Sequence, residues 1–146
     1  TAVADTPEFQ LGQLGAIVDD TNGTRIYKYL QYDTGSAGAA AVAGEVAYYY
    51  TLDGYKNFQV TSDLSDSVEI GAGVIQAAMT DGQYGWFQVT GVATLTIALT
   101  AGADGDPLTP TGAADGTLDV SAAATDNVCA IAGDISDKEI ICTFPL

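Results

Sequence analysis

Turn-forming residues interrupt this 146-residue chain at short intervals, and the runs between them are rich in Val, Ile, Thr, Tyr and Phe. No stretch keeps apolar residues at the 3.6-residue spacing of an amphipathic helix, whereas short β-branched and aromatic runs are typical of strands. We therefore expect an all-β fold, a small antiparallel β-barrel or β-sandwich. Residues 1–15 are predicted to form an extended N-terminal arm, and residues 16–146 a single β-domain. Hydrophobic residues make up 47% of the chain, enough for one core.

The clearest unit is a β-hairpin over residues 16–32. Its turn contains Asn22-Gly23, a pair that favours the positive φ angles of tight hairpin turns. In the second strand side chains alternate between the two faces. Tyr27 and Tyr29 therefore share one face, while Lys28 shares the other with its apolar neighbours.

Further strands are expected along the rest of the chain, and the Gly/Ala-rich residues 33–44 are predicted to be a loop. The polar residues 62–67 are predicted to be a second loop. Gly91 interrupts the longest β-prone run and indicates a bulge or a bend. The expected strands cover residues 45–51 and 57–61 (a hairpin around Asp53-Gly54), 74–78, 84–99, a short run around Leu108, and 118–120.

Aromatic side chains occur on both faces of the predicted strands. In Tyr84-Gly85-Trp86-Phe87 the first and third side chains point one way and Phe87 the other, so both faces should be covered. We expect a core or a subunit interface. A sugar-stacking platform that includes Tyr48-Tyr49-Tyr50 is the alternative. The residues assigned to the core or interface are Tyr27, Tyr29, Tyr84, Trp86 and Phe87.

The chain has two cysteines, which belong to a predicted C-terminal hairpin. Pairing Gly133 with Lys138 across a four-residue loop places Cys129 directly opposite Cys142. A cross-strand disulfide is conceivable, but directly opposed residues usually give a strained bridge. Because Cys is often a small core residue, buried reduced thiols are the favoured interpretation.

The sequence contains no histidine, which excludes Ser/His and Cys/His catalysis and His-based metal sites. Carboxylate chemistry remains. Asp19-Asp20 and Asp104-Gly105-Asp106 lack the spaced ligand set of a calcium loop, and Asp63 with Asp66 is a weak candidate for a glycosidase pair. We interpret these acids as turn and loop residues, and we expect neither an enzyme nor a cofactor nor a metal.

The formal net charge of −15, from four basic and 19 acidic residues, would repel a polyphosphate backbone. The same charge disfavours anionic membrane surfaces, and no apolar run approaches the length of a membrane-spanning helix. Nucleic acid and membranes are therefore not expected as partners.

Three segments of the chain resemble small virion proteins of tailed bacteriophages, the capsid decoration or cement proteins. The order of parts is also similar: a Gly-rich tract at residues 71–78 precedes the Tyr-Gly-Trp strand, and a Gly/Asp-rich middle leads to a hydrophobic hairpin. The resemblance covers most of the chain, although residues 35–44 depart from the usual pattern. The three segments are residues 8–12, 18–30 and 81–91.

This resemblance implies a β-rich, non-enzymatic virion protein, commonly a homotrimer, that is made in the host cytoplasm and binds the major capsid protein on the outer capsid surface. The arm offers Phe9, Leu11 and Leu14 as apolar anchors that could dock on a neighbour's sheet edge. A strand completing the chain's own barrel is the other interpretation. The alternative function is a carbohydrate- or receptor-binding β-domain of a phage tail, fibre or cell surface.

Overall fold

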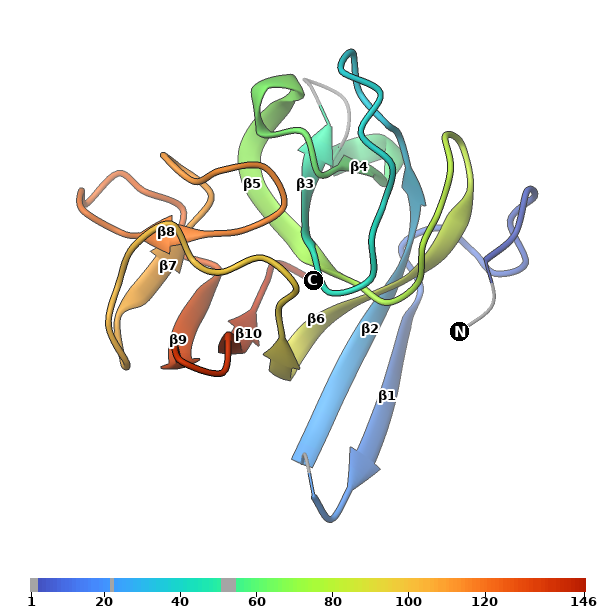
Figure 1. Cartoon of the computed structure of the whole chain (residues 1–146). Coiled ribbons are helices and arrows are strands. Elements are labelled where there is room, and N and C mark those ends of the chain that lie inside the picture. The colour runs from blue at the N-terminus through green and yellow to red at the C-terminus, as the bar shows by residue number, and fades with distance from the viewer. Residues whose placement is uncertain (1–2, 22, 51–54) are drawn as a thin grey trace.

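Five strands form a closed barrel at the centre of the molecule (Figure 1). The computed structural model describes residues 3–21, 23–50 and 55–146. The barrel strands are β2 (Gly23–Tyr32), β3 (Val46–Tyr50), β4 (Gln59–Thr61), β5 (Ser67–Ile75) and β6 (Tyr84–Thr94). They follow the order β2-β4-β3-β5-β6, and the barrel closes because β6 also pairs with β2. The predicted all-β fold is confirmed.

One pair of barrel strands is parallel, which differs from the antiparallel barrel predicted. Strand β4 runs alongside β2, with Gln31 opposite Gln59 and Tyr32 opposite Val60. The reason lies in the connection after β2, which places β3 one strand away and leaves room for β4 between them. Strand β3 runs opposite to β2, and β3 and β4 form the predicted antiparallel hairpin. Strand β4 therefore runs in the same direction as β2. The Asp53-Gly54 turn of that hairpin lies outside the described residues.

The first hairpin is confirmed and extends beyond the barrel. Strand β1 (Leu14–Asp19) pairs with β2 from Leu14 opposite Lys28 to Asp19 opposite Gly23. Strand β1 is the first strand in the sheet order, with β2 as its neighbour. Figure 1 shows the two strands, in blue, projecting away from the barrel. Asn22 of the turn lies outside the described residues.

Gly91 lies where β6 leaves the barrel. The β2–β6 register shifts between Ile26 and Tyr27, so the expected irregularity is present beside this glycine. Gly91 has φ +96°, and a Cβ there would lie 2.6 Å from the carbonyl oxygen of Thr24. Only glycine tolerates both conditions. Beyond this point β6 pairs with β10 and ends at Thr94, earlier than the predicted 99.

A second group of strands extends the sheet from β6, in the order β6-β10-β9-β7-β8. The short strands predicted around Leu108 and residues 118–120 are confirmed, as is the C-terminal hairpin. Strand β5 begins earlier and ends earlier than predicted, and a short 3-10 helix, η1, precedes it. The bounds are β7 (Pro107–Thr109), β8 (Asp119–Val120), β9 (Ala130–Asp134), β10 (Glu139–Thr143) and η1 (Leu64–Asp66).

The predicted register of the C-terminal hairpin is wrong by one residue. Asp134 lies opposite Glu139, the register shifts after Glu139, and Cys142 faces Ala130. Lys138 adopts a left-handed conformation with φ +57°, which makes it a turn residue and not a strand residue. The extra turn residue displaces the partner strand, so Cys129 is not directly opposite Cys142.

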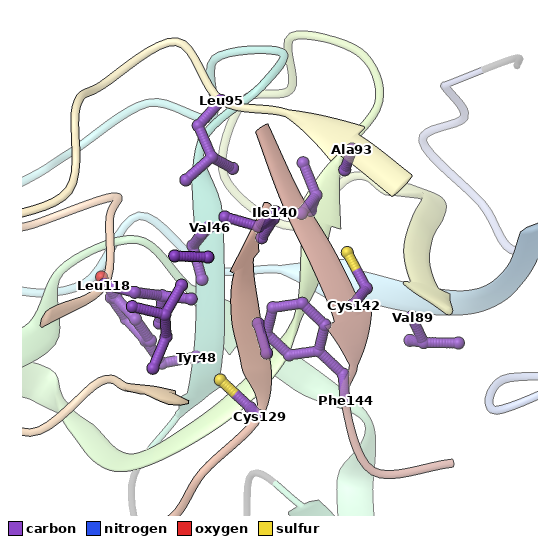
Figure 2. Close-up of a cluster of buried hydrophobic side chains, with 14 residues drawn as sticks. Val46, Tyr48, Val89, Ala93, Leu95, Leu118, Cys129, Ile140, Cys142 and Phe144 are labelled. Atoms are coloured by element: carbon purple, nitrogen blue, oxygen red, sulfur yellow. The ribbon is translucent and has the colours of Figure 1, made fainter. Parts of the chain in front are cut away.

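Buried side chains form two clusters, one inside the barrel and one between the barrel and the second group of strands. Strand β3 contributes to both because its side chains alternate: Tyr49 points into the barrel and Tyr48 into the second cluster. Figure 2 shows the second cluster, which contains Tyr48, Leu118 and Ile140 and in which the Phe144 ring lies between the two cysteines. The barrel cluster contains Leu30, Tyr32, Ala41, Ala47, Tyr49, Val60, Ala72, Ile75, Met79 and Phe87.

Candidate interaction surface

An apolar groove of about 420 Å³ lies between the N-terminal arm and the β1–β2 hairpin. Aromatic rings and small residues line most of it, and one carboxylate stands at its edge. The lining residues are Glu8, Phe9, Gly15, Ala16, Ile17, Tyr27 and Trp86. Gly15 lies beside the indole, and a Cβ there would meet the Trp86 ring at an ordinary contact distance of 3.6 Å.

The arm forms one wall of this groove by packing on the chain's own sheet. The ring of Phe9 lies 5.3 Å from that of Tyr29 and 5.1 Å from that of Trp86, measured between centroids. The backbone N–H of Gly12 donates to the carbonyl of Tyr29 at 2.8 Å, and Ala4 forms a bridge with Tyr84. The arm therefore packs on its own sheet, and the strand that includes its last residues, β1 (Leu14–Asp19), lies beside the barrel and does not complete it.

The outer strand of the hairpin, β1, exposes several apolar side chains. Leu14 is exposed, Ile17 is 51% exposed and Val18 is 75% exposed. Strand β1 contains no Lys or Pro, the residues that commonly protect a sheet edge from pairing with another chain. An apolar edge beside an apolar groove is typical of a protein interaction surface.

The remaining predicted arm and aromatic residues are distributed between the groove and the interior. Leu11 is half-buried. Tyr29 is buried and stacks on the half-buried Tyr84, with 6.4 Å between ring centroids. Phe87 lies inside the barrel, while Tyr27 and Trp86 line the groove. The structure thus brings Phe9, Tyr27, Tyr29, Tyr84 and Trp86 together, and it places Leu11, Leu14 and Phe87 elsewhere.

The aromatic platform proposed for sugars is largely internal. Tyr48 and Tyr49 are fully buried. The Tyr48 hydroxyl donates to the backbone carbonyl of Thr117, so its polar group is satisfied inside the protein. Burial raises the pKa of both phenols well above the usual range. These two rings therefore cannot stack on a ligand at the surface.

A second apolar stripe crosses the outer face of the C-terminal strands. Ile141 of β10 lies directly opposite Val92 of β6 on one side and Ile131 of β9 on the other. All three side chains are exposed. The predicted register had hidden this alignment, because it placed Ile131 opposite Ile140, which is buried. The alignment follows from the left-handed conformation of Lys138, which a lysine does not signal in the sequence.

Both cysteines are free thiols in the second core cluster. Burial raises the pKa of both, that of Cys142 to about 12. Neither thiol therefore provides a thiolate nucleophile near neutral pH.

Lys28 is a buried cation that sequence reasoning did not single out. It is 3% exposed, and its face is that of Leu30 in the barrel core, as alternation along the strand indicates. Its ammonium lies 5.4–5.5 Å from the ring centroids of Tyr49, Tyr55 and Phe58. The alternation along the strand could have predicted this burial, because it places Lys28 on an apolar face. A lysine on such a face either projects past the core or finds a partner inside it.

The acidic pairs singled out in the sequence mostly serve as turn acceptors. Asp104 accepts a hydrogen bond from the N–H of Ile135 at 2.9 Å, and Asp106 accepts one from Ala103 at 2.8 Å. In residues 3–21, 23–50 and 55–146, no three acidic, cysteine or histidine side chains gather closely enough to hold a metal ion. None of the helices formed by these described residues is both long enough and apolar enough to span a membrane.

Comparison with known proteins finds no significant similarity: no family model, curated protein or solved structure matches this chain. The likeness to capsid decoration proteins therefore stays a prediction from the sequence. The fold and the two apolar surfaces are the observations on which a functional proposal can be built.

Proposed function

We propose that this chain is a structural capsid decoration protein, which binds the outer surface of a phage head and reinforces contacts between capsomers. The observation that carries the proposal is the projecting β1–β2 hairpin, whose apolar edge adjoins the groove at Phe9 and Trp86. A surface of this kind offers both side-chain contacts and free backbone groups to a capsid protein. The resemblance described above supplies the identity of that partner.

The energetics favour the hairpin as the docking element. Burying one large apolar side chain contributes about 1.5–3 kcal/mol, so Ile17, Val18 and Phe9 together offer a substantial binding free energy. An added strand from the partner would also satisfy the outward backbone groups of β1. Among the residues that the structure describes, Glu8 is the one carboxylate that lines the groove, so docking there requires little desolvation of charge.

Self-association is assigned to the other apolar surface, the stripe of Val92, Ile131 and Ile141. Adjacent, exposed β-branched side chains on three neighbouring strands form an apolar area that a second copy can cover. The homotrimer implied by the resemblance would need such an area, because each copy carries a net charge of −15 and repels the others. Separate surfaces for the capsid and for self-association allow both contacts at once.

Co-sedimentation with phage heads that lack the protein tests the capsid proposal. Ile17→Asp and Val18→Asp should each reduce occupancy at least about tenfold, since each removes 1.4 kcal/mol or more of apolar contact. Val128→Asp is the matched control, because Val128 is also an exposed valine but lies away from the groove and the hairpin. Unchanged occupancy for both hairpin variants would contradict the proposal.

A carbohydrate-binding function is the second candidate, favoured by the groove itself. The rings of Phe9, Tyr27 and Trp86 with the Glu8 carboxylate offer stacking and one hydrogen-bond acceptor, a combination suited to a sugar ring. Glycan-array binding that disappears in Trp86→Ala would favour this candidate. Head binding that is lost in Ile17→Asp, without any glycan signal, would favour the decoration protein.

A further inference from the structure

Strand β1 is a sheet edge whose backbone groups point outward at every second residue. At the start of its pairing with β2, the N–H of Tyr29 donates to the carbonyl of Gln13 at 2.9 Å, so Gln13 directs its backbone toward β2. Successive residues of an antiparallel strand direct their backbone groups to opposite sides. The register with β2 continues without a shift along β1. The backbone groups of Leu14, Ala16 and Val18 therefore point away from β2, where another strand can pair with them.

This edge is complementary to a second copy of itself. Suppose that two β1 strands pair antiparallel, with Ala16 of one copy opposite Ala16 of the other. Leu14 then lies opposite Val18 of the second copy, so the outward backbone groups of both strands meet in hydrogen-bonded pairs. A two-fold axis through this point repeats every contact, as in most symmetric dimers. The paired segment, residues 14–18, contains no charged residue.

The same register fills the apolar groove beside Trp86. It places Ile17 of the second copy opposite Gly15, and opposed residues of an antiparallel pair carry their side chains on the same face. Gly15 lines the groove and has no side chain of its own, and its Cβ position lies 3.6 Å from the indole. Ile17 is 51% exposed. The second copy therefore brings an exposed apolar side chain into the groove, where it covers the Trp86 ring.

The neighbouring registers fit less well. With the two-fold axis at Ile17, the two Ile17 side chains oppose each other and Gly15 faces Asp19. With the axis at Gly15, two glycines face each other and no side chain enters either groove. With the axis at Ala16, Asp19 faces Gln13, so the one charged residue of the strand does not oppose an acid. This matters because each copy carries a net charge of −15.

We propose that, away from a phage head, two copies of this chain pair through β1 into a two-fold dimer, in which Ile17 of each copy occupies the groove beside Gly15 of the other. The dimer covers an apolar edge that would otherwise be open to pairing with other chains. It is separate from the stripe of Val92, Ile131 and Ile141, and it holds whatever partner the edge meets in a virion. Since one edge pairs with one strand at a time, a capsid protein docked on β1 replaces the second copy.

Cysteine cross-linking of the full-length chain tests the register. Ala16→Cys should form a disulfide-linked dimer on mild oxidation, because hydrogen-bonded opposite residues have Cα atoms about 5.5 Å apart, within the range of a disulfide. Leu14→Cys and Val18→Cys should each fail to cross-link alone, since equivalent residues lie roughly 14 Å apart along the strand. A mixture of these two variants should cross-link. The native thiols are buried and do not interfere. Cross-linking of Leu14→Cys or Val18→Cys alone as readily as Ala16→Cys would overturn the proposal.

Sedimentation equilibrium measures the dimer without a cross-link. Ile141→Asp serves as the background, because it removes the stripe contact between copies. In this background the chain should still dimerise, and adding Ile17→Asp should raise the dissociation constant at least about tenfold, a loss of 1.4 kcal/mol or more. Val128→Asp, at another exposed apolar residue, should leave the dissociation constant unchanged. A monomer at every concentration in the Ile141→Asp background, or equal effects of Ile17→Asp and Val128→Asp, would refute the β1 dimer.

Phage heads separate this proposal from the capsid proposal. The cross-linked Ala16→Cys dimer should not bind heads, whereas the same variant in reductant should bind. A cross-linked dimer that binds heads equally well would contradict capsid docking through β1 and leave the dimer intact. Failure of Ala16→Cys to cross-link, together with loss of head binding in Ile17→Asp, would overturn the dimer and support the capsid proposal.

Discussion

The ammonium of Lys28 donates a hydrogen bond to the hydroxyl oxygen of Tyr49, with 2.9 Å between Nζ and Oη. Both groups are buried, and the partner of the cation is a phenol in place of the usual carboxylate. Cation–π contacts with the surrounding rings offset part of the cost of removing the charge from water. Burial nevertheless lowers the pKa of Lys28 below its ordinary value of 10.5.

Lys28→Met should therefore be at least as stable as the wild type at neutral pH, by up to about 1 kcal/mol, because it removes a buried charge. The advantage should shrink as pH rises towards 10.5, since the unfolded wild-type chain then binds more protons than the folded one. Urea unfolding at several pH values measures this difference. Lys138→Met, at an exposed lysine, should show no such trend, and parallel curves for Lys28→Met would refute the prediction.

Gly71→Ala should destabilise the protein by about 1–3 kcal/mol, because an added Cβ overpacks the second core. It would lie 2.7 Å from the Phe144 ring and 2.8 Å from the sulfur of Cys129. Gly15→Ala is the control: it also lies in a strand, but its Cβ would meet the nearest ring at an ordinary 3.6 Å. Thermal melting of the two variants provides the comparison, and equal melting temperatures would count against tight packing at Gly71.

The native protein should not react with thiol reagents, and both cysteines should react once it is unfolded in urea. Cys129 and Cys142 are 2% and 1% exposed, and burial raises the pKa of both thiols. Because the unfolded thiols ionise near 9.0 and the folded ones do not, their contribution to stability is complete below pH 9 and declines above it. Mass spectrometry after alkylation counts the modified thiols. A native thiol that labels rapidly would contradict the buried arrangement.

Phe9→Ala should lower stability by about 0.5–1.5 kcal/mol, the contribution of its aromatic contacts. It should also shift the fluorescence of Trp86 to longer wavelength, since the indole loses a covering ring. Trp86 is the single tryptophan of the chain, so the emission reports on this site alone. Tyr55→Ala, whose ring contacts Tyr49 and Lys28 instead, should leave the emission unchanged.

Self-association should weaken at very low ionic strength, because copies with a net charge of −15 repel each other more strongly when screening is reduced. Light scattering across a salt series measures the effect. Ile141→Asp should lower the apparent mass at every salt concentration, while Val128→Asp should follow the wild type. Association that strengthens as salt is removed would argue for a polar interface instead.

Local signals in the sequence predicted much of this fold. Asn22-Gly23 located the first hairpin, and Gly91 located the bend in β6, because each feature depends on nearby backbone geometry. The parallel pairing of β4 with β2 could not be read in the same way, since it depends on where β3 lies in space. The C-terminal register failed at Lys138, a residue type that gives no warning of a left-handed conformation.

The candidate sites show the same division. Phe9 was identified as an apolar anchor, but its contact with Trp86 joins residues far apart in the sequence. Asp63 and Asp66 were noticed as a pair of loop carboxylates. Their proximity to Gly35 arises only when the loop after β2 meets η1. Pairwise spacing along the chain carries no information about such a contact.

Strand β3 has no solvent-facing side over its central residues, since Tyr48 belongs to one core and Tyr49 to the other. The barrel and the C-terminal strands therefore cannot melt in separate stages without leaving one of these phenols in water. Calorimetry should record a single heat-absorption peak with matching calorimetric and van't Hoff enthalpies. We therefore expect that neither half of the chain folds without the other. In any assembly, each copy is then either wholly folded or wholly unfolded.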